Sequence, residues 1–119
     1  MSAPSNRSDA FSPFDVVIVP FPYADRLAEK RRPAVVVSAP ELSRKYGLVW
    51  LVMVTSADNR AWDCDVTVGD LKVAGLPAPS LIRPAKLATV DAARILRRIG
   101  HLSAKDARAL GAELKTLFG

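Results

Sequence analysis

A cluster of cations and one hydroxyl are the residues of this sequence that could act together on a phosphodiester. Lys30, Arg31 and Arg32 are consecutive and stand just before an apolar run, and Thr55 directly follows another. An arginine offers a permanent positive charge and a planar fork that matches two phosphate oxygens, and a threonine hydroxyl adds a short hydrogen-bond donor. Basic clusters are also common on solvated surfaces, so the position of this one relative to Thr55 is decisive.

Two short apolar segments should position these residues. The segments 34–38 and 48–54 are continuous apolar runs, a pattern typical of strands that are buried on both faces. The connection 39–47 contains turn-forming residues and has a length that usually joins antiparallel neighbours. In an antiparallel pair the start of one strand lies beside the end of the next, so we expect Arg32 and Thr55 to share one rim of the sheet.

The rest of the chain predicts further strands followed by one helix. We expect a first strand over residues 15–21, a surface loop over residues 22–33 and a half-exposed strand over residues 63–68. Further short strand segments are expected around residues 80–83, 86–89 and 94–99. Ser103 and Asp106 form a capping pattern, and apolar residues then recur at helical spacing up to Phe118. The outline is five or six strands and a C-terminal helix, in a mainly β fold of the α+β class.

Composition limits the possible functions. The 119 residues suffice for one domain, and a chain that is half apolar and 24% charged is expected to fold. The net charge of +5 favours an anionic partner such as a nucleic acid. A single cysteine, Cys64, fits the reducing cytoplasm, and no apolar run approaches the ~20 residues needed to cross a membrane. We interpret residues 1–13 as a flexible tail and residues 14–119 as the domain.

Five further residues invite a functional interpretation. His101 is the only histidine and cannot supply a paired acid and base, so we expect it to end a strand. Asp63 and Asp65 share one strand face without a third ligand nearby, which favours a solvated face over a metal site. Trp50 is expected in the core or a dimer interface, and Trp62 is a candidate for stacking on a base.

Four motifs in this sequence resemble those of the PemK/MazF toxins of bacterial toxin–antitoxin pairs. They are, in chain order, D-V-V-I-V-P-F, R-R-P-A-V-V-V-S, L-V-M-V-T-S and the long run from G-L-P-A-P-S-L-I-R-P to R-R-I-G-H-L-S. The resemblance covers the chain from Phe14 to its end. It implies a small SH3-like antiparallel β-barrel, of the type shared by CcdB and PemK, that cleaves single-stranded RNA, usually as a homodimer, and is inhibited by a cognate antitoxin protein.

The resemblance also assigns residues to the site. The catalytic arginine of the family corresponds to Arg32 and its catalytic hydroxyl to Thr55. Neither a metal nor another cofactor is implied. The remaining candidates for RNA contact are basic, hydroxyl or aromatic residues expected near the same rim: Arg26, Lys30, Arg31, Ser56, Arg60, Trp62 and Lys86.

The reaction that the resemblance implies is attack of an RNA 2′-hydroxyl on its own phosphate. It leaves a 2′,3′-cyclic phosphate and a 5′-hydroxyl, and it spares DNA because DNA lacks the nucleophile. We expect Arg32 to stabilise the charge of the phosphorane rather than to carry a proton, because a guanidinium is permanently protonated. We expect Thr55 to donate a hydrogen bond to a nonbridging oxygen.

The sequence departs from the family pattern in two places. Phe14-Asp15 stands where many members have Gly-Asp, so the turn before the first strand should be built differently. Ala85 and Lys86 stand where better-known members have a polar Asp-Gln pair that could read base edges. The sequence specificity of cleavage therefore does not transfer from the family.

An alternative function on the same barrel is a toxin that binds without cleaving. One form would be directed at gyrase, as CcdB is, and the other would be a degenerate nuclease that retains only its contacts. The gyrase-directed form calls for a C-terminal tryptophan, whereas this chain ends in Leu117-Phe118-Gly119. The degenerate form stays open, because catalysis depends on placement that a sequence does not report.

Overall fold

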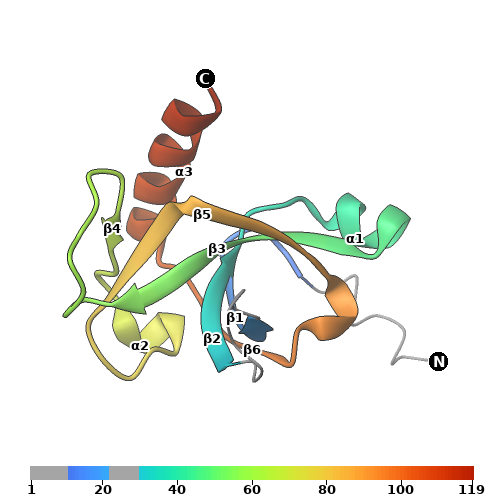
Figure 1. The fold of residues 1–119 in the computed structure, drawn as a ribbon, viewed down its shortest axis with the longest axis horizontal. Coiled ribbons are helices and arrows are strands. Elements are labelled where there is room, and N and C mark those ends of the chain that lie inside the picture. The colour runs from blue at the N-terminus through green and yellow to red at the C-terminus, as the bar shows by residue number, and fades with distance from the viewer. Residues whose placement is uncertain (1–10, 22–29) are drawn as a thin grey trace.

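The computed structural model describes residues 11–21 and 30–119 (Figure 1). Most of the predicted tail and loop, with Arg26, therefore lie outside the described residues, and the proposed domain boundary stays a prediction. The elements in chain order are β1 Asp15–Phe21, β2 Lys30–Val36, α1 Pro40–Tyr46, β3 Leu48–Ser56, β4 Val66–Thr67, α2 Leu71–Ala74, β5 Ser80–Asp91, the 3-10 helix η2 Ala92–Arg94, β6 Arg97–His101 and α3 Ala104–Phe118.

The six strands form one antiparallel sheet that curls into a half-barrel, as the mainly β prediction required (Figure 1). The strand order is β4-β5-β3-β2-β1-β6, so β2 and β3 occupy the middle of the sheet. Long β-branched runs suit such central positions because both of their faces are covered. The predicted pairing of β2 with β3 is confirmed, and it is antiparallel.

Both faces of the central strands are buried, in two separate apolar clusters. Val35 and Val52 belong to the cluster that packs under α3, whereas Ala34 and Leu51 belong to the cluster on the opposite face. Alternate residues of a strand point to opposite faces, so each central strand contributes to both clusters. Trp50 is 41% exposed, so of its two expected positions the core is wrong and the dimer interface stays a prediction.

The short helix α2 lies directly against β6, one of the two edge strands of the sheet. A Cβ atom on Gly100 of β6 would lie 2.4 Å from the carbonyl oxygen of Val73, and one on Gly75 would lie 2.1 Å from the carbonyl oxygen of Ile99. Two backbones can approach this closely only where neither carries a side chain. These two glycines therefore allow α2 to cover the edge of the sheet.

The C-terminal helix begins as the sequence predicted. The Ser103 side chain accepts a hydrogen bond from the Asp106 backbone amide and caps α3, while β6 ends at His101. Leu110 and Leu114 are buried in the cluster beneath the helix, whereas its C-terminal end extends away from the sheet (Figure 1). Leu110 and Leu114 thus anchor the helix, whereas its last residues, Leu117 and Phe118, are exposed.

The turn before β1 keeps a glycine-like backbone although it carries a phenylalanine. Phe14 has a φ of 76°, which lies in the left-handed region that glycine favours. Its amide donates to the carbonyl of Val36, its carbonyl accepts from the amide of Leu102, and its ring packs against the core. These contacts offset a conformational cost of about 1–2 kcal/mol for a residue other than glycine in this region.

Two predictions about the strands were wrong. The strand β2 begins at Lys30, so the basic cluster lies on a strand rather than in a loop, because β1 supplies pairing partners as far as Phe21. The two predicted strands around Pro84 are one strand, β5, in which residues 84–86 form a bulge without partners on β3. A bulge accommodates a proline because no ladder hydrogen bond is required there.

Two further differences concern the segments between the strands. The predicted strand 63–68 is reduced to β4, Val66–Thr67, because residues 62–65 form a turn in which the Asp65 amide donates to the Trp62 carbonyl. The helices α1 and α2 were not predicted. None of the helices in the described part of the chain is long and apolar enough to span a bilayer.

Candidate functional site

Arg32 and Thr55 lie at the same end of the central strand pair. The last residues of β2 and β3 paired at this end are Ala34 and Met53. Continuing the antiparallel register by two residues on each strand brings Arg32 opposite Thr55, on the same face of the sheet as Ala34 and Met53. Arg32 also pairs with Val19 of β1. The shared rim expected from the sequence is therefore the arrangement that the strand register produces.

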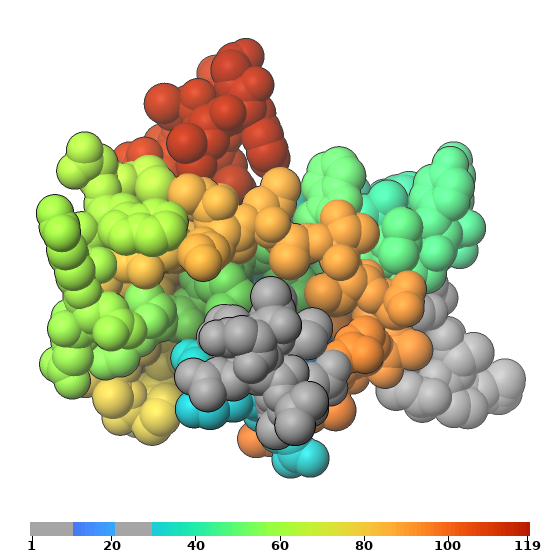
Figure 2. All heavy atoms as spheres, viewed as in Figure 1, coloured from blue at the N-terminus to red at the C-terminus, as the bar shows by residue number. Residues whose placement is uncertain are grey.

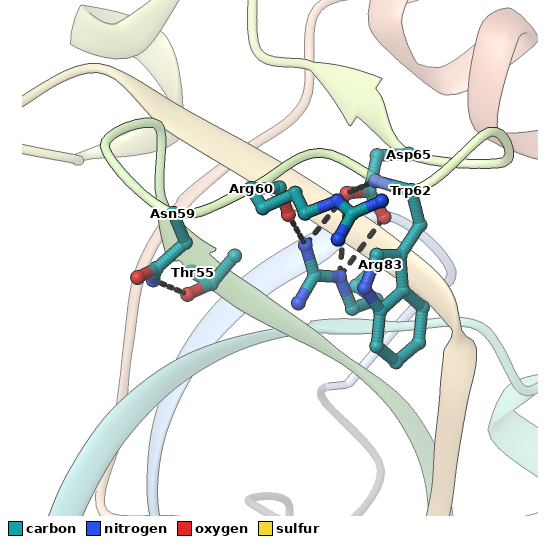
Figure 3. Close-up of polar contacts among 6 residues, drawn as sticks. All are labelled: Thr55, Asn59, Arg60, Trp62, Asp65 and Arg83. Atoms are coloured by element: carbon teal, nitrogen blue, oxygen red, sulfur yellow. Dashed lines mark hydrogen bonds and ion pairs between the residues drawn. The ribbon is translucent and has the colours of Figure 1, made fainter.

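Thr55 is the penultimate residue of β3 and is half-buried. Its Oγ1 accepts a hydrogen bond from the side-chain amide of Asn59, which lies in the loop after the strand (Figure 3). A hydroxyl that accepts from an amide keeps its own proton for another acceptor. Asn59 thus orients Thr55 as a donor, and no feature of the sequence pointed to that role.

A second polar group lies beside Thr55 and is centred on Arg83 of β5. Arg83 pairs with Met53, two residues before Thr55 and on the same face of β3. The Arg83 Nε donates to Asp65 Oδ1 at 3.1 Å and Nη2 donates to Asp65 Oδ2 at 2.8 Å. Nη2 also donates to the carbonyl of Arg60 at 2.8 Å. Figure 3 shows these contacts converging on one guanidinium.

The Asp65 carboxylate is buried and charged. Its side chain is 2% exposed, and that of Arg83 is 12% exposed. Burial by itself would raise the pKa of Asp65, but hydrogen bonds from Arg83 and from the Trp62 backbone, with the positive charge of Arg83, hold that pKa below its ordinary value. The hydrogen bond with Asp65 in turn raises the pKa of Arg83. The expectation that Asp65 is a solvated residue is wrong.

The indole of Trp62 covers the Arg83 guanidinium. The guanidinium carbon is 4.1 Å from the ring centroid, and the Lys86 Nζ is 5.9 Å from it. Trp62 is nevertheless 43% exposed, so part of its ring faces solvent. The turn that carries the ring is closed by Asp65, whose Oδ2 accepts from the Trp62 amide at 2.8 Å. One carboxylate therefore positions both the cation and the aromatic ring.

The other residues predicted to contact RNA are spread around this end of the sheet. Lys30 and Arg31 are exposed on the first two positions of β2. Arg60 is exposed in the loop after β3. Ser56 follows Thr55 and faces the opposite side of the strand, where its Oγ accepts from the Asp58 amide. Arg32, Thr55 and the group of Trp62 and Arg83 thus lie at the same end of the sheet, whereas Ser56 faces the opposite side of β3.

The described part of the chain was expected from the sequence to hold no metal ion, and the side chains of Asp65 and His101 have other contacts. Within residues 11–21 and 30–119, no group of three or more histidine, cysteine, aspartate or glutamate side chains could hold one. Asp65 is paired with Arg83, and His101 contacts the carbonyl of Leu102 through Nδ1.

The fold and this rim define a small β-half-barrel with a cationic, hydroxyl-bearing end. A sequence model of the PemK-like, MazF-like toxins of type II toxin–antitoxin systems matches residues 12–118. The chain belongs to this family. No curated protein sequence matches it.

Solved structures of toxins share the fold. The Mycobacterium tuberculosis toxin MazF-mt6 is 23% identical, with a TM-score of 0.70 over 87% of this chain and 95% of that one. MazF from Deinococcus radiodurans is 22% identical, with a TM-score of 0.72 over 91% and 96%. A mycobacterial endoribonuclease in complex with its cognate antitoxin is 17% identical, with a TM-score of 0.74 over 92% and 96%.

Proposed function

We propose that this protein is a metal-independent endoribonuclease toxin that cleaves single-stranded RNA, with Arg32 and Thr55 at its active site. The observation that carries the proposal is the β2–β3 register, which directs a permanent cation and an oriented hydroxyl to one end and one face of the sheet. Membership of the PemK-like, MazF-like family supports it. We expect the protein to cleave its RNA substrate in the cytoplasm.

The reaction is attack of a ribose 2′-hydroxyl on the adjacent phosphate, which yields a 2′,3′-cyclic phosphate and a 5′-hydroxyl. Arg32 neutralises the charge that gathers on the phosphorane oxygens, a role that suits a planar, permanently protonated fork. Thr55 donates a hydrogen bond to a nonbridging oxygen of the phosphate. Its hydroxyl hydrogen is available for this because Asn59 already occupies an acceptor site on Oγ1. Lys30, Arg31, Arg60 and Lys86 attract the neighbouring phosphates.

The test is RNA cleavage in the presence of EDTA, with the product ends mapped. Wild-type protein should leave cyclic phosphates, and Thr55→Val, which keeps the shape of threonine, should lower the rate roughly 100- to 1,000-fold. Thr55→Ser should retain most activity, and Arg32→Lys should lose most of it because lysine lacks the fork. Arg108→Ala, a charge loss on the exposed side of α3, is the matched control. Cleavage that depends on an added divalent ion would refute the mechanism.

The competing function is a degenerate toxin that binds RNA without cutting it. The same experiment separates the two, because such a protein would retard RNA in a gel at low salt while leaving it intact. Binding through phosphate contacts should weaken steeply as the salt concentration rises. An affinity that does not change with salt would show that the basic residues of the rim do not bind RNA phosphates.

We further propose that a cognate antitoxin inhibits the protein and that the protein forms a homodimer. The Deinococcus radiodurans MazF is known in complex with MazE, and the mycobacterial endoribonuclease in complex with its antitoxin. An acidic segment that orders on binding would suit the basic rim of this chain. Undiminished RNA cleavage after the purified pair has been mixed would count against the inhibitor, and a monomeric mass in sedimentation would count against the dimer.

A further inference from the structure

Arg83 is fixed in a single orientation before any ligand arrives. Both of its partners, the Asp65 carboxylate and the Arg60 carbonyl, bind it through Nε and Nη2. The side chains of this ion pair are almost fully buried. An arginine usually loses considerable rotamer entropy when it binds a ligand, and here that entropy is already lost on folding. Such an arginine is suited to specific recognition, because its hydrogen-bond donors already have fixed directions.

The third guanidinium nitrogen of Arg83 is available to a ligand. Within residues 11–21 and 30–119, Nη1 makes no hydrogen bond, so it presents two N–H donors. In Figure 3 the nitrogen without a dashed line lies on the side of Thr55. The pairing of Arg83 with Met53 supports this placement, because Met53 and Thr55 share one strand face.

The charge of this group favours a base over a phosphate. Asp65 is ionised and buried against Arg83, so the pair has almost no net charge. A phosphate would gain little from a cation that is already neutralised, whereas a carbonyl oxygen of a neutral base needs only the donors. The indole of Trp62 packs over the guanidinium at 4.1 Å and helps to hold these donors in place.

We propose that Arg83, held by Asp65 and by the indole of Trp62, is a specificity-determining residue that binds the nucleobase next to the phosphate held at Thr55. The base accepts hydrogen bonds from Arg83 Nη1 through a carbonyl oxygen. Uracil, guanine and cytosine carry such an oxygen and adenine does not, so the site selects against adenine. This inference rests on the proposed function, since it names the part of the RNA that the same rim recognises.

The test uses RNA analogues that cannot be cleaved and reads the fluorescence of Trp62 alone. The variant Trp50→Phe removes the only other tryptophan of the chain. Hexamers of 2′-O-methyl uridine and 2′-O-methyl adenosine are titrated into this variant at fixed salt. We expect saturable quenching by both, with uridine bound about tenfold more tightly, since one hydrogen bond lost to an unpaired donor is of that order.

Two substitutions separate base recognition from charge. Arg83→Lys keeps the positive charge but lacks the fixed fork, and Asp65→Asn keeps the shape but releases the guanidinium. Each should reduce the preference for uridine below about threefold, with a circular dichroism spectrum that is unchanged. Arg60→Ala, which keeps the backbone carbonyl, is the matched control and should weaken binding of both hexamers while leaving their ratio unchanged.

Equal affinity of the parent protein for the two hexamers, or an intact preference in Arg83→Lys, would overturn the inference. These results differ from a failure of the proposed nuclease function. RNA that stays intact while the uridine preference persists would refute catalysis alone. Cleavage that needs Arg32 but is insensitive in its base preference to Arg83 would refute this inference alone.

Discussion

Alanine substitutions at four glycines, of which Gly75 and Gly100 lie at the close contact between α2 and β6, should change stability in a defined order. Gly100→Ala should destabilise the protein by about 3 kcal/mol, the upper end of the cost of over-packing. The added Cβ would lie 2.4 Å from the carbonyl oxygen of Val73 and 2.7 Å from that of Ala74, whereas ordinary contacts begin near 3.4 Å. Both neighbours are backbone atoms, so α2 must shift by about 1 Å and lose contacts with the core.

The other three glycines separate steric overlap from backbone strain. Gly75→Ala combines a φ of +76° with overlap against Ile99, so it should be the most damaging of the series. Gly47→Ala has a φ of +67° but open space, so it should cost only about 1–2 kcal/mol. Gly111→Ala lies within α3 with nothing nearby, and it should stabilise the protein by about 1 kcal/mol through helix propensity.

Urea denaturation followed by far-ultraviolet circular dichroism measures this order directly. With a slope of about 2 kcal/mol per molar urea, a loss of about 3 kcal/mol lowers the midpoint by about 1.5 M. Gly100→Ala should also retain its RNA cleavage rate per folded molecule at low urea, because β6 does not carry Arg32 or Thr55. A Gly100→Ala midpoint within about 0.25 M of wild type would show that α2 does not pack on β6 as described.

Two further predictions concern buried carboxylates. Asp106→Ala should lower the free energy of unfolding by about 2–3 kcal/mol in a urea titration, because Asp106 Oδ2 accepts from the amides of Gly69 and Asp70 at 2.9 and 3.2 Å. Asp106→Asn should lose less than half of that amount. Equal losses in the two variants would contradict this role. The pKa of Asp65 is lowered in the folded state. Its ion pair therefore stabilises the protein fully above the unfolded pKa of about 3.9, and this stabilisation is lost as the pH falls through the folded pKa. Thermal melts between pH 5 and 2.5 should therefore show a smaller decline for Asp65→Asn than for wild type, and parallel declines would refute the assignment.

The central strands could be predicted because their signal is local. The runs 15–21, 34–38 and 48–54 are β-branched and continuous, and buried strands with two covered faces need such residues. Because a short connection joins the second and third of these strands, their antiparallel pairing followed. Arg32 and Thr55 could therefore be placed at one rim without any coordinates.

The Arg83 group could not be predicted because its members meet only through the sheet. Asp65 and Arg83 are 18 residues apart in the chain, and they meet because β4 pairs with β5 in the register that sets Val66 opposite Ile82 and hence Asp65 opposite Arg83. One signal was present, namely an arginine within the otherwise apolar segment S-L-I-R-P, which requires an acidic partner when it is buried. Nothing in the sequence identified Asp65 as that partner.

The core position expected for Trp50 is wrong for a related reason. A tryptophan inside an apolar run suggests a core position, but whether a strand face is covered depends on which elements pack over it. Lys30 to Arg32 were placed in a loop because charged residues rarely indicate a strand, whereas β1 extends far enough to pair with them.

By itself the sequence determined the residue types, the central strands, the capped C-terminal helix and the rim shared by Arg32 and Thr55. Only the tertiary structure decided that Asn59 orients Thr55, that Asp65 is buried against Arg83 and that two glycines admit α2 to the sheet edge. Propensity and periodicity act over a few residues of chain. Side-chain partners are selected by the register and curvature of the sheet, which are set by burying two apolar clusters at once.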